Sequence, residues 1–319
     1  MLLKEQIGLG TAAIGRPQYI NIKEKSTDDS FDLATFKKKG RLILDAAYQQ
    51  GIRYFDTAPG YGLAEELVLE WVREKRDTTI EVATKWGYTY VANFDPTATT
   101  HEIKEHSLAK LKEQWTVSQQ LLPYLTSYQI HSATLDTGVL DNPSILERLA
   151  DLKLKHQLII GLTTSGANQN EVLQKALPIK VNGELLFDLF QVTYNVFDQS
   201  LAAISEQLEA LDKRIVIKEA LANGRVFPNK KYPYYQNAYQ IFQRLANKYA
   251  VGIDAIALRF CLDSLSPYKV LSGAAQTQHV RDNLKVYDFR LDKEDLSTLK
   301  RLKIYPEKYW SERKQLQWN

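Results

Sequence analysis

The sequence of 319 residues contains a single cysteine, Cys261, which excludes a disulfide within the chain. Cys261 stands between Phe260 and Leu262, and this apolar context predicts a buried, inert thiol. Proteins of reducing compartments have few or no disulfides. We therefore expect a cytoplasmic protein.

The chain also lacks a long apolar run and a strong excess of one charge. No run approaches the roughly 18 apolar residues of a membrane-spanning helix, and no charged-then-apolar segment opens the sequence. The 41 basic and 38 acidic residues leave a net charge of +3. Such a balance does not indicate binding to nucleic acid or to a membrane surface. We expect neither as a partner.

No stretch rich in proline, glycine or serine divides the sequence, so we expect one domain over residues 1–319. Hydrophobic residues make up 44% of the chain and charged residues 25%. This composition is typical of a globular protein that buries a large core.

Eight short apolar or β-branched runs recur along the chain, and each is compatible with a strand buried on both faces. Segments with helical spacing separate these runs. A strand followed by a helix, repeated eight times, predicts a closed (β/α)8 barrel (a TIM barrel) rather than an open sheet. The runs cover residues 7–9, 52–55, 80–84, 128–130, 158–162, 189–193, 215–217 and 270–271.

Capping signals support the helices between and after these runs. Asn142 and Pro143 mark a helix start. The segment 238–262 is long enough for two helices, with a break near Gly252. Asp292 opens a further helix after the eighth strand, and a tail rich in aromatic residues follows it. We expect this C-terminal helix and tail to pack outside the barrel or over its mouth.

Chemically reactive side chains follow three successive predicted strands. Asp56 follows the second strand, and Tyr61 lies five residues later in a Pro-Gly turn. Lys85 follows the third strand and His131 the fourth. The carboxyl ends of barrel strands meet at one face, where active sites of such barrels lie. We therefore expect these four side chains to lie close together.

This set of residues suits the protonation of a developing alkoxide. A phenol is a weak acid, with an ordinary pKa of about 10, and a nearby ammonium lowers that pKa. Lys85 would do this for Tyr61, Asp56 would keep Lys85 charged and aimed, and His131 would orient the substrate oxygen by a hydrogen bond. Because no side chain delivers hydride, a nicotinamide cofactor is implied.

Each of these residues taken alone has an ordinary structural explanation. Asp56 fits a strand-end turn, Tyr61 a half-buried aromatic, and His131 a core histidine. Lys85 fits a structural ion pair with Asp56, since an unpaired lysine at a buried strand end is costly. Their joint occurrence at strand ends, in this order, favours a functional site.

The chain resembles the aldo-keto reductases through these residues and through motifs in chain order. The motifs are GLGT at 8–11, FDTA at 55–58, ATK at 83–85, YQIH at 128–131 and FQVTYN at 190–195. The resemblance implies that Asp56, Tyr61, Lys85 and His131 are the catalytic tetrad, with Tyr61 as acid and base. It also implies a small carbonyl or alcohol substrate and, by default, a monomer.

The same resemblance implies a set of cofactor-binding residues. Thr163, Thr164 and Gln191 would hold the nicotinamide carboxamide, the turn 221–224 would lie along the pyrophosphate, and Asp282 and Asn283 would meet the adenine end. The implied set is Gly10, Thr11, Thr163, Thr164, Gln191, Lys218, Leu221, Asn223, Gly224, Gly273, His279, Asp282 and Asn283.

Three features depart from the family pattern. The pair Thr163 and Thr164 stands where the family usually has Ser-Asn, so hydroxyls replace an amide. Lys218 stands where the family often has an aromatic residue that stacks on the nicotinamide, or an arginine. Only six residues precede the first predicted strand, so we expect the N-terminal hairpin that closes the barrel floor to be absent.

The basic residues near the eighth strand bear on the choice of cofactor. His279, Arg281 and Lys285 could bind a 2′-phosphate, with Arg225 nearby. The family mostly prefers NADPH, and we expect NADP(H) rather than NAD(H).

Aromatic residues after the first and third strands suggest the substrate wall. Trp86 directly follows Lys85, and Tyr19 lies in the long loop after the first strand. Apolar and aromatic side chains usually line ligand pockets. We therefore predict that Trp86 and Tyr19 border the substrate.

Two other functions fit parts of the sequence. A regulatory protein of the same fold would keep the cofactor site and the tetrad but hardly turn over. A lyase or isomerase could use Lys85 as a Schiff-base amine, although Asp56 and Tyr61 are better explained by reduction. His101 and His106 have no third ligand nearby in the sequence, so no metal site is predicted.

Overall fold

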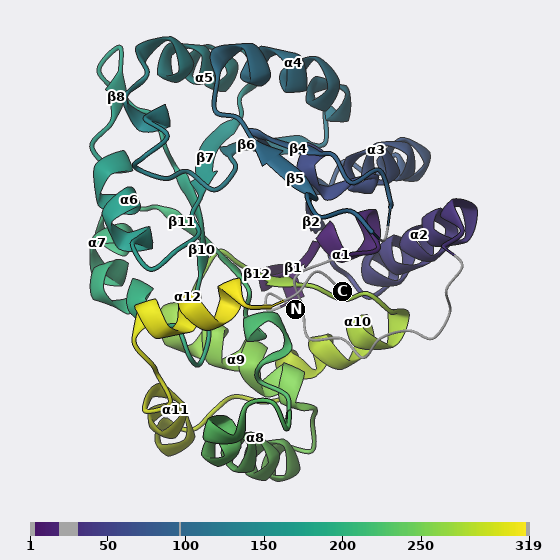
Figure 1. The fold of residues 1–319 in the computed structure, drawn as a ribbon, viewed down its shortest axis with the longest axis vertical. Coiled ribbons are helices and arrows are strands. Elements are labelled where there is room, and N and C mark those ends of the chain that lie inside the picture. Colours follow the sequence, from purple (N-terminus) through teal and green to yellow (C-terminus); the bar gives the residue numbers. More distant parts are fainter. Residues whose placement is uncertain (1–3, 19–30, 96, 317–319) are drawn as a thin grey trace.

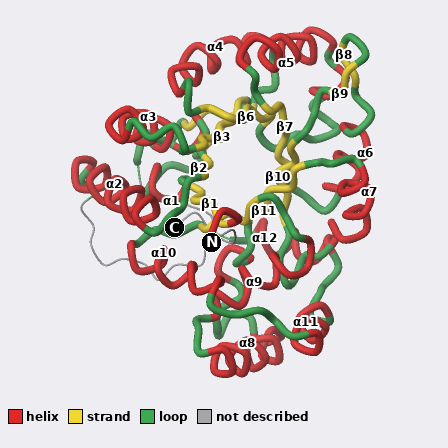
Figure 2. The backbone as a smooth tube through the Cα atoms, turned by 180° about the vertical axis from the view of Figure 1, so that it is seen from behind, coloured by secondary structure: helices red, strands yellow, loops and turns green. Residues whose placement is uncertain are grey.

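The computed structural model describes residues 4–18, 31–95 and 97–316. Eight parallel strands form a closed barrel in the order β1-β12-β11-β10-β7-β6-β3-β2. Figure 2 shows the strands as a ring with the helices outside it. The strands are β1 (Ile7–Gly10), β2 (Tyr54–Asp56), β3 (Glu81–Trp86), β6 (Leu125–Ile130), β7 (Ile159–Thr163), β10 (Leu189–Thr193), β11 (Arg214–Lys218) and β12 (Lys269–Ser272).

Helices surround the barrel and connect its strands (Figure 1). Asn142 caps one of them by accepting a hydrogen bond from the Ile145 amide, and the long predicted helical segment is broken at Gly252. The helices are α1 (Ala12–Gly15), α2 (Leu33–Gln49), α3 (Ala64–Lys75), α4 (Leu108–Ser118), α5 (Pro143–His156), α6 (Gln169–Ala176), α7 (Ser205–Ala210), α8 (Gln236–Tyr249), α9 (Ile253–Leu265), α10 (Thr277–Leu284), α11 (Lys293–Lys300) and α12 (Pro306–Lys314).

Successive residues of each strand point to opposite sides of the barrel wall. In β2, Phe55 belongs to the large core between strands and helices, whereas Tyr54 belongs to a smaller cluster inside the barrel. Leu189, Val216 and Leu271 of other strands share that interior cluster. Asp56 lies two residues after Tyr54, so its carboxylate also points into the barrel. It lies at the mouth, which the carboxyl ends of the strands form.

The amino ends of the strands form the barrel floor, which is closed by charged and aromatic side chains. Lys269 donates a hydrogen bond from Nζ to the Glu5 carbonyl at 2.7 Å, and Nζ lies 4.6 Å from the Tyr268 ring centroid. The Tyr268 hydroxyl donates to Glu81 Oε2 at 2.7 Å. Among residues from Lys4 onward, a short helix (Lys4–Gln6) is the only element before β1. These residues contain no N-terminal hairpin, which the sequence predicted to be absent.

All eight predicted strands are confirmed, with end positions that differ by a few residues. The predicted break between two helices near Gly252 is also confirmed. Two short hairpins were not anticipated: β4 (Tyr88–Tyr90) with β5 (Glu102–Lys104), and β8 (Lys180–Val181) with β9 (Glu184–Leu185).

The C-terminal region contains more helix than expected. Its predicted helix is α11, and much of the expected aromatic tail forms a second helix, α12, which contains Tyr309 and Trp310. In Figure 1, α12 lies in front of the strands rather than in the outer ring of helices. Within the described ranges, we find no helix long and apolar enough to cross a membrane.

Candidate active site

A buried ion pair joins two strands at the mouth of the barrel. Lys85 Nζ lies 2.6 Å from Asp56 Oδ2, and neither side chain is more than 3% exposed. The ammonium also donates to the Thr57 carbonyl at 2.9 Å. Alternation along β3 brings Lys85 inside the barrel, next to the carboxylate of the neighbouring strand β2. A buried lysine held in this way keeps a fixed position.

Two further residues hold Asp56. Gln191 of β10 donates from Nε2 to Asp56 Oδ1 at 2.6 Å across the barrel. Thr11 donates to the Asp56 carbonyl through both its amide and its hydroxyl, each at 2.9 Å. Asp56 is thus fixed at its backbone by Thr11, directly after β1, and at its carboxylate by Lys85 and Gln191. Both Thr11 and Gln191 were predicted to contact cofactor; in this structure they position the acid.

Tyr61 lies beside this ion pair. A one-turn helix (Pro59–Tyr61) presents it, and Lys85 Nζ is 4.8 Å from its ring centroid. Burial and then the charge of Asp56 raise the pKa of Tyr61 well above its ordinary value, although Arg16 opposes them. We expected Lys85 to lower this pKa. Burial accounts for most of the difference, and the negative charge of Asp56 adds to it. Tyr61 is therefore a neutral phenol with a proton to give.

His131 completes the group. Its ring lies edge-on to Tyr61, with 5.4 Å between the ring centroids, and 4.6 Å from the ring of Tyr88. Burial, followed by the charges of Lys85, Arg16 and Lys218, lowers the pKa of His131 well below its ordinary value. The imidazole is therefore neutral, and its buried Nδ1 has no hydrogen-bond partner. All four predicted catalytic side chains are brought together.

Arg16 is a site residue that the sequence did not suggest. It donates from Nη1 to the Gly60 carbonyl at 2.9 Å and to Glu102 Oε2 at 2.8 Å. Its guanidinium carbon lies 5.4 Å from the Tyr61 ring centroid. Arg16 thereby ties the turn that carries Tyr61 to hairpin strand β5. Its position just before Pro17 gave no sign of this role.

The inward residues at the ends of β7, β10 and β11 form the opposite side of the mouth. Thr163 accepts a hydrogen bond at Oγ1 from the Ser132 amide at 2.7 Å. Lys218 donates to Thr193 Oγ1 at 3.0 Å and to Ser165 Oγ at 3.4 Å. Thr164 is fully buried and turned towards α6, where its hydroxyl contacts Gln169 at 3.4 Å. Of the predicted threonine pair, Thr163 is the one on the interior side.

The turn after β11 is strained and attached to α12. Left-handed φ values occur at Glu219 (56°), Ala222 (49°), Asn223 (56°) and Gly224 (89°). Non-glycine residues adopt this region at a cost, and such strain clusters at functional sites. The predicted pyrophosphate turn from Leu221 to Gly224 coincides with it.

Helix α12 attaches to this turn through buried charges. Arg313 donates to Glu219 Oε1 through Nε at 2.9 Å and Nη2 at 2.7 Å. Although burial opposes it, Arg313 and Lys218 lower the pKa of Glu219 to about 2. Arg225 is also buried and donates to the Tyr309 carbonyl at 3.1 Å. It therefore faces α12 and is not available to a 2′-phosphate.

The predicted adenine end lies at β12 and α10. Gly273 is exposed, and a Cβ atom there would meet nothing within 4 Å. Asn283 is buried and its amide is used inside the protein, accepting from Ser272 and donating to Asp254, each at 2.6 Å. Asp282 pairs with Lys285 on the surface at 2.8 Å, and His279 is exposed. Gly10 lies at the end of β1, paired with Asp56 in register.

The model of the Aldo/keto reductase family matches residues 6–304. The chain belongs to the aldo-keto reductase family. Its members are oxidoreductases that act on carbonyl or alcohol groups with nicotinamide cofactors. The sequence resemblance stated above is thereby confirmed.

Individual relatives are distant but similar in length. The chain is 23% identical to Aldo-keto reductase YhdN of Bacillus subtilis (strain 168), with 91% of this chain and 87% of that protein covered. It is 25% identical to the NADH-specific methylglyoxal reductase of Escherichia coli (strain K12), with 93% and 94% covered. The holo form of aldo-keto reductase AKR11C1 from Bacillus halodurans matches with a TM-score of 0.69 at 22% identity, with 93% and 91% covered. The structural match supports the predicted barrel.

Trp86 and Tyr19 were the predicted substrate contacts of this aldo-keto reductase. Trp86 is fully buried in the core between strands and helices, 5.6 Å from the ring of His106. Because it follows Lys85 directly, alternation turns it away from the barrel interior. Its contact with substrate stays a prediction. Tyr19 lies outside the described residues.

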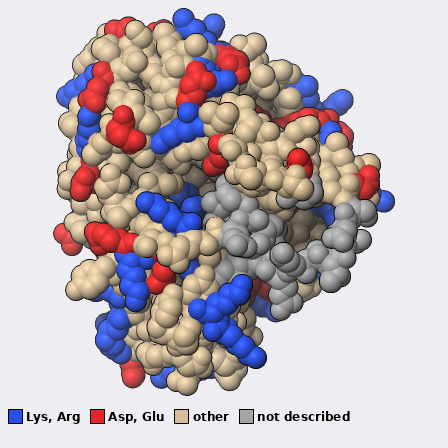
Figure 3. Space-filling model, in the orientation of Figure 1, with Lys and Arg blue, Asp and Glu red and all other residues tan. Residues whose placement is uncertain are grey.

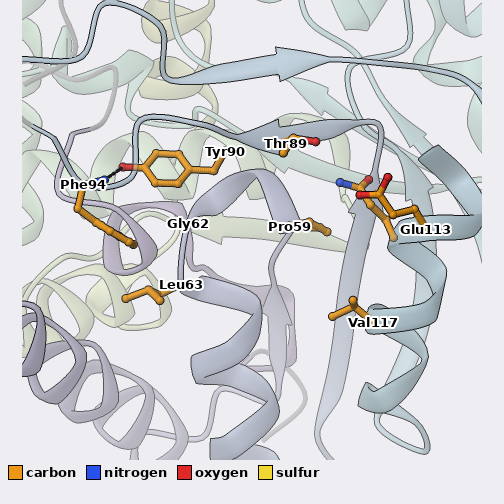
Figure 4. Close-up of a pocket in the computed structure, with 9 residues that line it drawn as sticks. Pro59, Gly62, Leu63, Thr89, Tyr90, Phe94, Glu113 and Val117 are labelled. Atoms are coloured by element: carbon orange, nitrogen blue, oxygen red, sulfur yellow. Dashed lines mark hydrogen bonds between the residues drawn. The ribbon is translucent and has the colours of Figure 1, made fainter. Parts of the chain in front are cut away.

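A cavity of about 310 Å³ lies next to the tetrad-bearing turn but outside the barrel. Figure 4 shows Pro59 and Leu63 on one side of it, Thr89 and Tyr90 above, and Val117 of α4 on the other side. Its lining does not include Lys85 or His131, so it is separate from the reactive side chains. No group of three or more potential metal ligands occurs in the described part of the chain.

Proposed function

We propose that this aldo-keto reductase catalyses nicotinamide-dependent reduction of a small aldehyde or ketone, or the reverse oxidation, with Tyr61 as the acid and base. The observation that carries the proposal is the contact of a neutral Tyr61 with Lys85 and His131 at the barrel mouth. A phenol in contact with an ammonium and a neutral imidazole suits proton transfer to a carbonyl oxygen.

The residues present fit a nicotinamide cofactor. Thr163 and Gln191 are uncharged hydrogen-bonding residues on the adjacent strands β7 and β10, which suits a carboxamide. At the other end, Gln276 makes no side-chain cap bond to the first turn of α10, and the open space at Gly273 lies beside it. Free amides at a helix start favour phosphate groups. When bound, the cofactor supplies the hydride that no side chain can supply.

Each tetrad residue has a distinct role in this proposal. Tyr61 gives its proton to the carbonyl oxygen in reduction and takes it back in oxidation. Lys85 stabilises the phenolate that remains, and Asp56 fixes Lys85 at 2.6 Å. His131 is neutral, so it donates a hydrogen bond to the substrate oxygen without adding charge. These roles use preorganised groups, which require little rearrangement during the reaction.

We also propose a preference for NADPH over NADH. The support is the basic side chains His279, Arg281 and Lys285 on and after α10, since a 2′-phosphate binds such donors. Arg225, once included among them, instead lies under α12. One relative bears the name of an NADH-specific enzyme, so the preference is decided by titration with both cofactors.

A substrate screen tests the proposed function. Full-length protein is incubated with NADPH or NADH and a panel of aldehydes, ketones and sugars, and cofactor oxidation is followed over many turnovers. Sustained turnover with at least one carbonyl is expected. Slow oxidation of a single equivalent of cofactor would favour the regulatory protein instead. Covalent trapping of a carbonyl on Lys85 by borohydride would favour the Schiff-base enzyme.

A further inference from the structure

Lys218 carries a positive charge in the mouth of the barrel, and among the described residues no carboxylate lies within hydrogen-bond distance of its ammonium. It is the last residue of β11, and its side chain is 17% exposed. Its ammonium has one hydrogen bond near the ideal length, to Thr193 Oγ1 at 3.0 Å, and one longer contact with Ser165 at 3.4 Å. The nearest carboxylate oxygen, on Glu219, is 3.9 Å away.

The carboxylates around Lys218 are engaged by other partners. Glu219 accepts two hydrogen bonds from Arg313 through the same oxygen that lies nearest to Lys218. Asp56 is held by Lys85 and Gln191. Asp198, the next acid, accepts from Trp310 Nε1 at 3.0 Å and from Ser200 at 2.6 Å. None of them makes a direct hydrogen bond to Lys218, so its charge is only partly offset.

The charge of Lys218 reaches the reactive side chains. It contributes to the lowered pKa of His131, after burial, Lys85 and Arg16. Burial lowers the pKa of Lys218 itself to about 8, with Glu219 opposing and Arg313 and Lys85 adding to the effect. The lysine is therefore still charged near neutral pH. In Figure 3, a small group of Lys and Arg atoms lies left of the middle, close to where α12 lies in Figure 1.

We propose that Lys218 makes the nicotinamide site bind the reduced cofactor more tightly than the oxidised one, and so biases the site towards carbonyl reduction. The oxidised nicotinamide ring carries a positive charge and the reduced ring is neutral. A ring held by Thr163 and Gln191 would lie close to Lys218, because Thr193, its hydrogen-bond partner, follows Gln191 by two residues on the same interior side of β10. This inference rests on the proposed function.

The positive charge of Lys218 also favours reduction through its effect on the substrate. A carbonyl gains negative charge as it accepts hydride, and it then takes a proton from Tyr61 to become an alcohol. The cofactor is oxidised and gains positive charge in the same step. An ammonium whose charge is only partly offset therefore disfavours the positive ring and favours the negative oxygen. At a separation of several ångströms near a protein surface, one charge changes a binding constant by roughly ten- to a hundredfold.

Cofactor titrations test the inference without measuring turnover. Dissociation constants for NADPH and NADP⁺, and for NADH and NAD⁺, are measured by fluorescence and competition on the full chain. The variants are Lys218→Met, which removes the charge, and Lys218→Arg, which keeps it. Lys112→Met on the exposed face of α4 removes a charge far from the barrel interior and is the matched control. Lys218→Gln repeats the neutralisation if the methionine variant does not fold.

The ratio of the oxidised to the reduced dissociation constant is the decisive quantity. The two forms differ only in the nicotinamide ring, so a lysine that bound phosphates or only supported the fold would change both constants alike. We expect the wild-type ratio to fall about tenfold or more in Lys218→Met, and to be kept in Lys218→Arg and Lys112→Met. A ratio unchanged on neutralisation would overturn the inference alone. If the wild type binds neither form, the proposed function fails as well.

Discussion

The two ends of the barrel interior both contain buried charges, but they hold them differently. At the floor, Lys269 is bonded to the Glu5 carbonyl and packed against Tyr268, which in turn donates to Glu81. At the mouth, His131 Nδ1 has no partner and Lys218 lies 3.9 Å from the nearest acid. Lys269 and Tyr268 at the floor thus have partners, whereas His131 and Lys218 at the mouth are left under-satisfied.

This difference is what we expect if charge serves stability at the floor and, as proposed, chemistry at the mouth. A satisfied buried network rigidifies the fold. Groups left without partners cost stability and are expected where a ligand completes them. In barrels of this type, ligands bind at the carboxyl ends of the strands, in agreement with the mouth of this protein.

The largest effect is expected for the ion pair at the mouth. Lys85→Met should lower turnover by at least about a hundredfold, because Tyr61 loses the cation that stabilises its phenolate. It should also destabilise the fold by about 3–5 kcal/mol, since the carboxylate of Asp56 is left buried and unpaired. Assays of turnover and urea unfolding measure both effects.

The matched control for that change is the double variant Asp56→Asn with Lys85→Met. Removing both charges leaves no unpaired carboxylate, so we expect part of the lost stability to return while turnover stays low. If Lys85→Met alone kept a tenth or more of wild-type turnover, the pair of Asp56 and Lys85 would have a structural role only, like the charges at the floor.

A smaller effect is expected from pH through Lys218. Its folded pKa is about 8, below its ordinary value of 10.5, so between these values the unfolded chain binds more protons. Stability contributed through this group is therefore gained as pH rises across that window, by about 1–3 kcal/mol at most. Urea unfolding at both ends of this pH window measures the effect. The free energy of unfolding should rise across the window in wild type and should not show this rise in Lys218→Met. Identical pH profiles would show that the charge is fully compensated.

The smallest effect is expected at the floor. Tyr268→Phe removes the hydroxyl that donates to Glu81 at 2.7 Å and leaves the ring in place. We expect a loss of about 1–2 kcal/mol in the free energy of unfolding and unchanged kcat. A large fall in kcat would mean that the floor takes part in positioning the tetrad, against the contrast drawn here.

Much of the fold could be predicted because parallel strands buried on both faces leave short apolar runs in the sequence. The tetrad could be anticipated for a related reason. A reactive residue directly after a strand has a known position in a barrel, whatever its neighbours are. Asp56, Lys85 and His131 all satisfy this condition.

The remaining features depend on contacts between segments far apart in the sequence. The attachment of Glu219 to Arg313 joins residues 94 positions apart, and no local pattern indicates it. Trp86 is a different case, because strand alternation, which is a local pattern, already turns it away from the interior that its neighbour Lys85 faces. The raised pKa of Tyr61 depends first on burial and then on the charge of Asp56, and the extent of burial is known only from the folded structure.

The central claim is that Tyr61 supplies the proton, and the same substitution at each end of the barrel tests it most directly. Tyr61→Phe and Tyr268→Phe each remove one phenolic oxygen. With the best carbonyl substrate, Tyr61→Phe should lose about 10²–10⁴-fold in kcat while its cofactor dissociation constant stays within a few fold of wild type. Tyr268→Phe should keep wild-type kcat. A Tyr61→Phe variant that reduces the substrate at the wild-type rate would contradict the account.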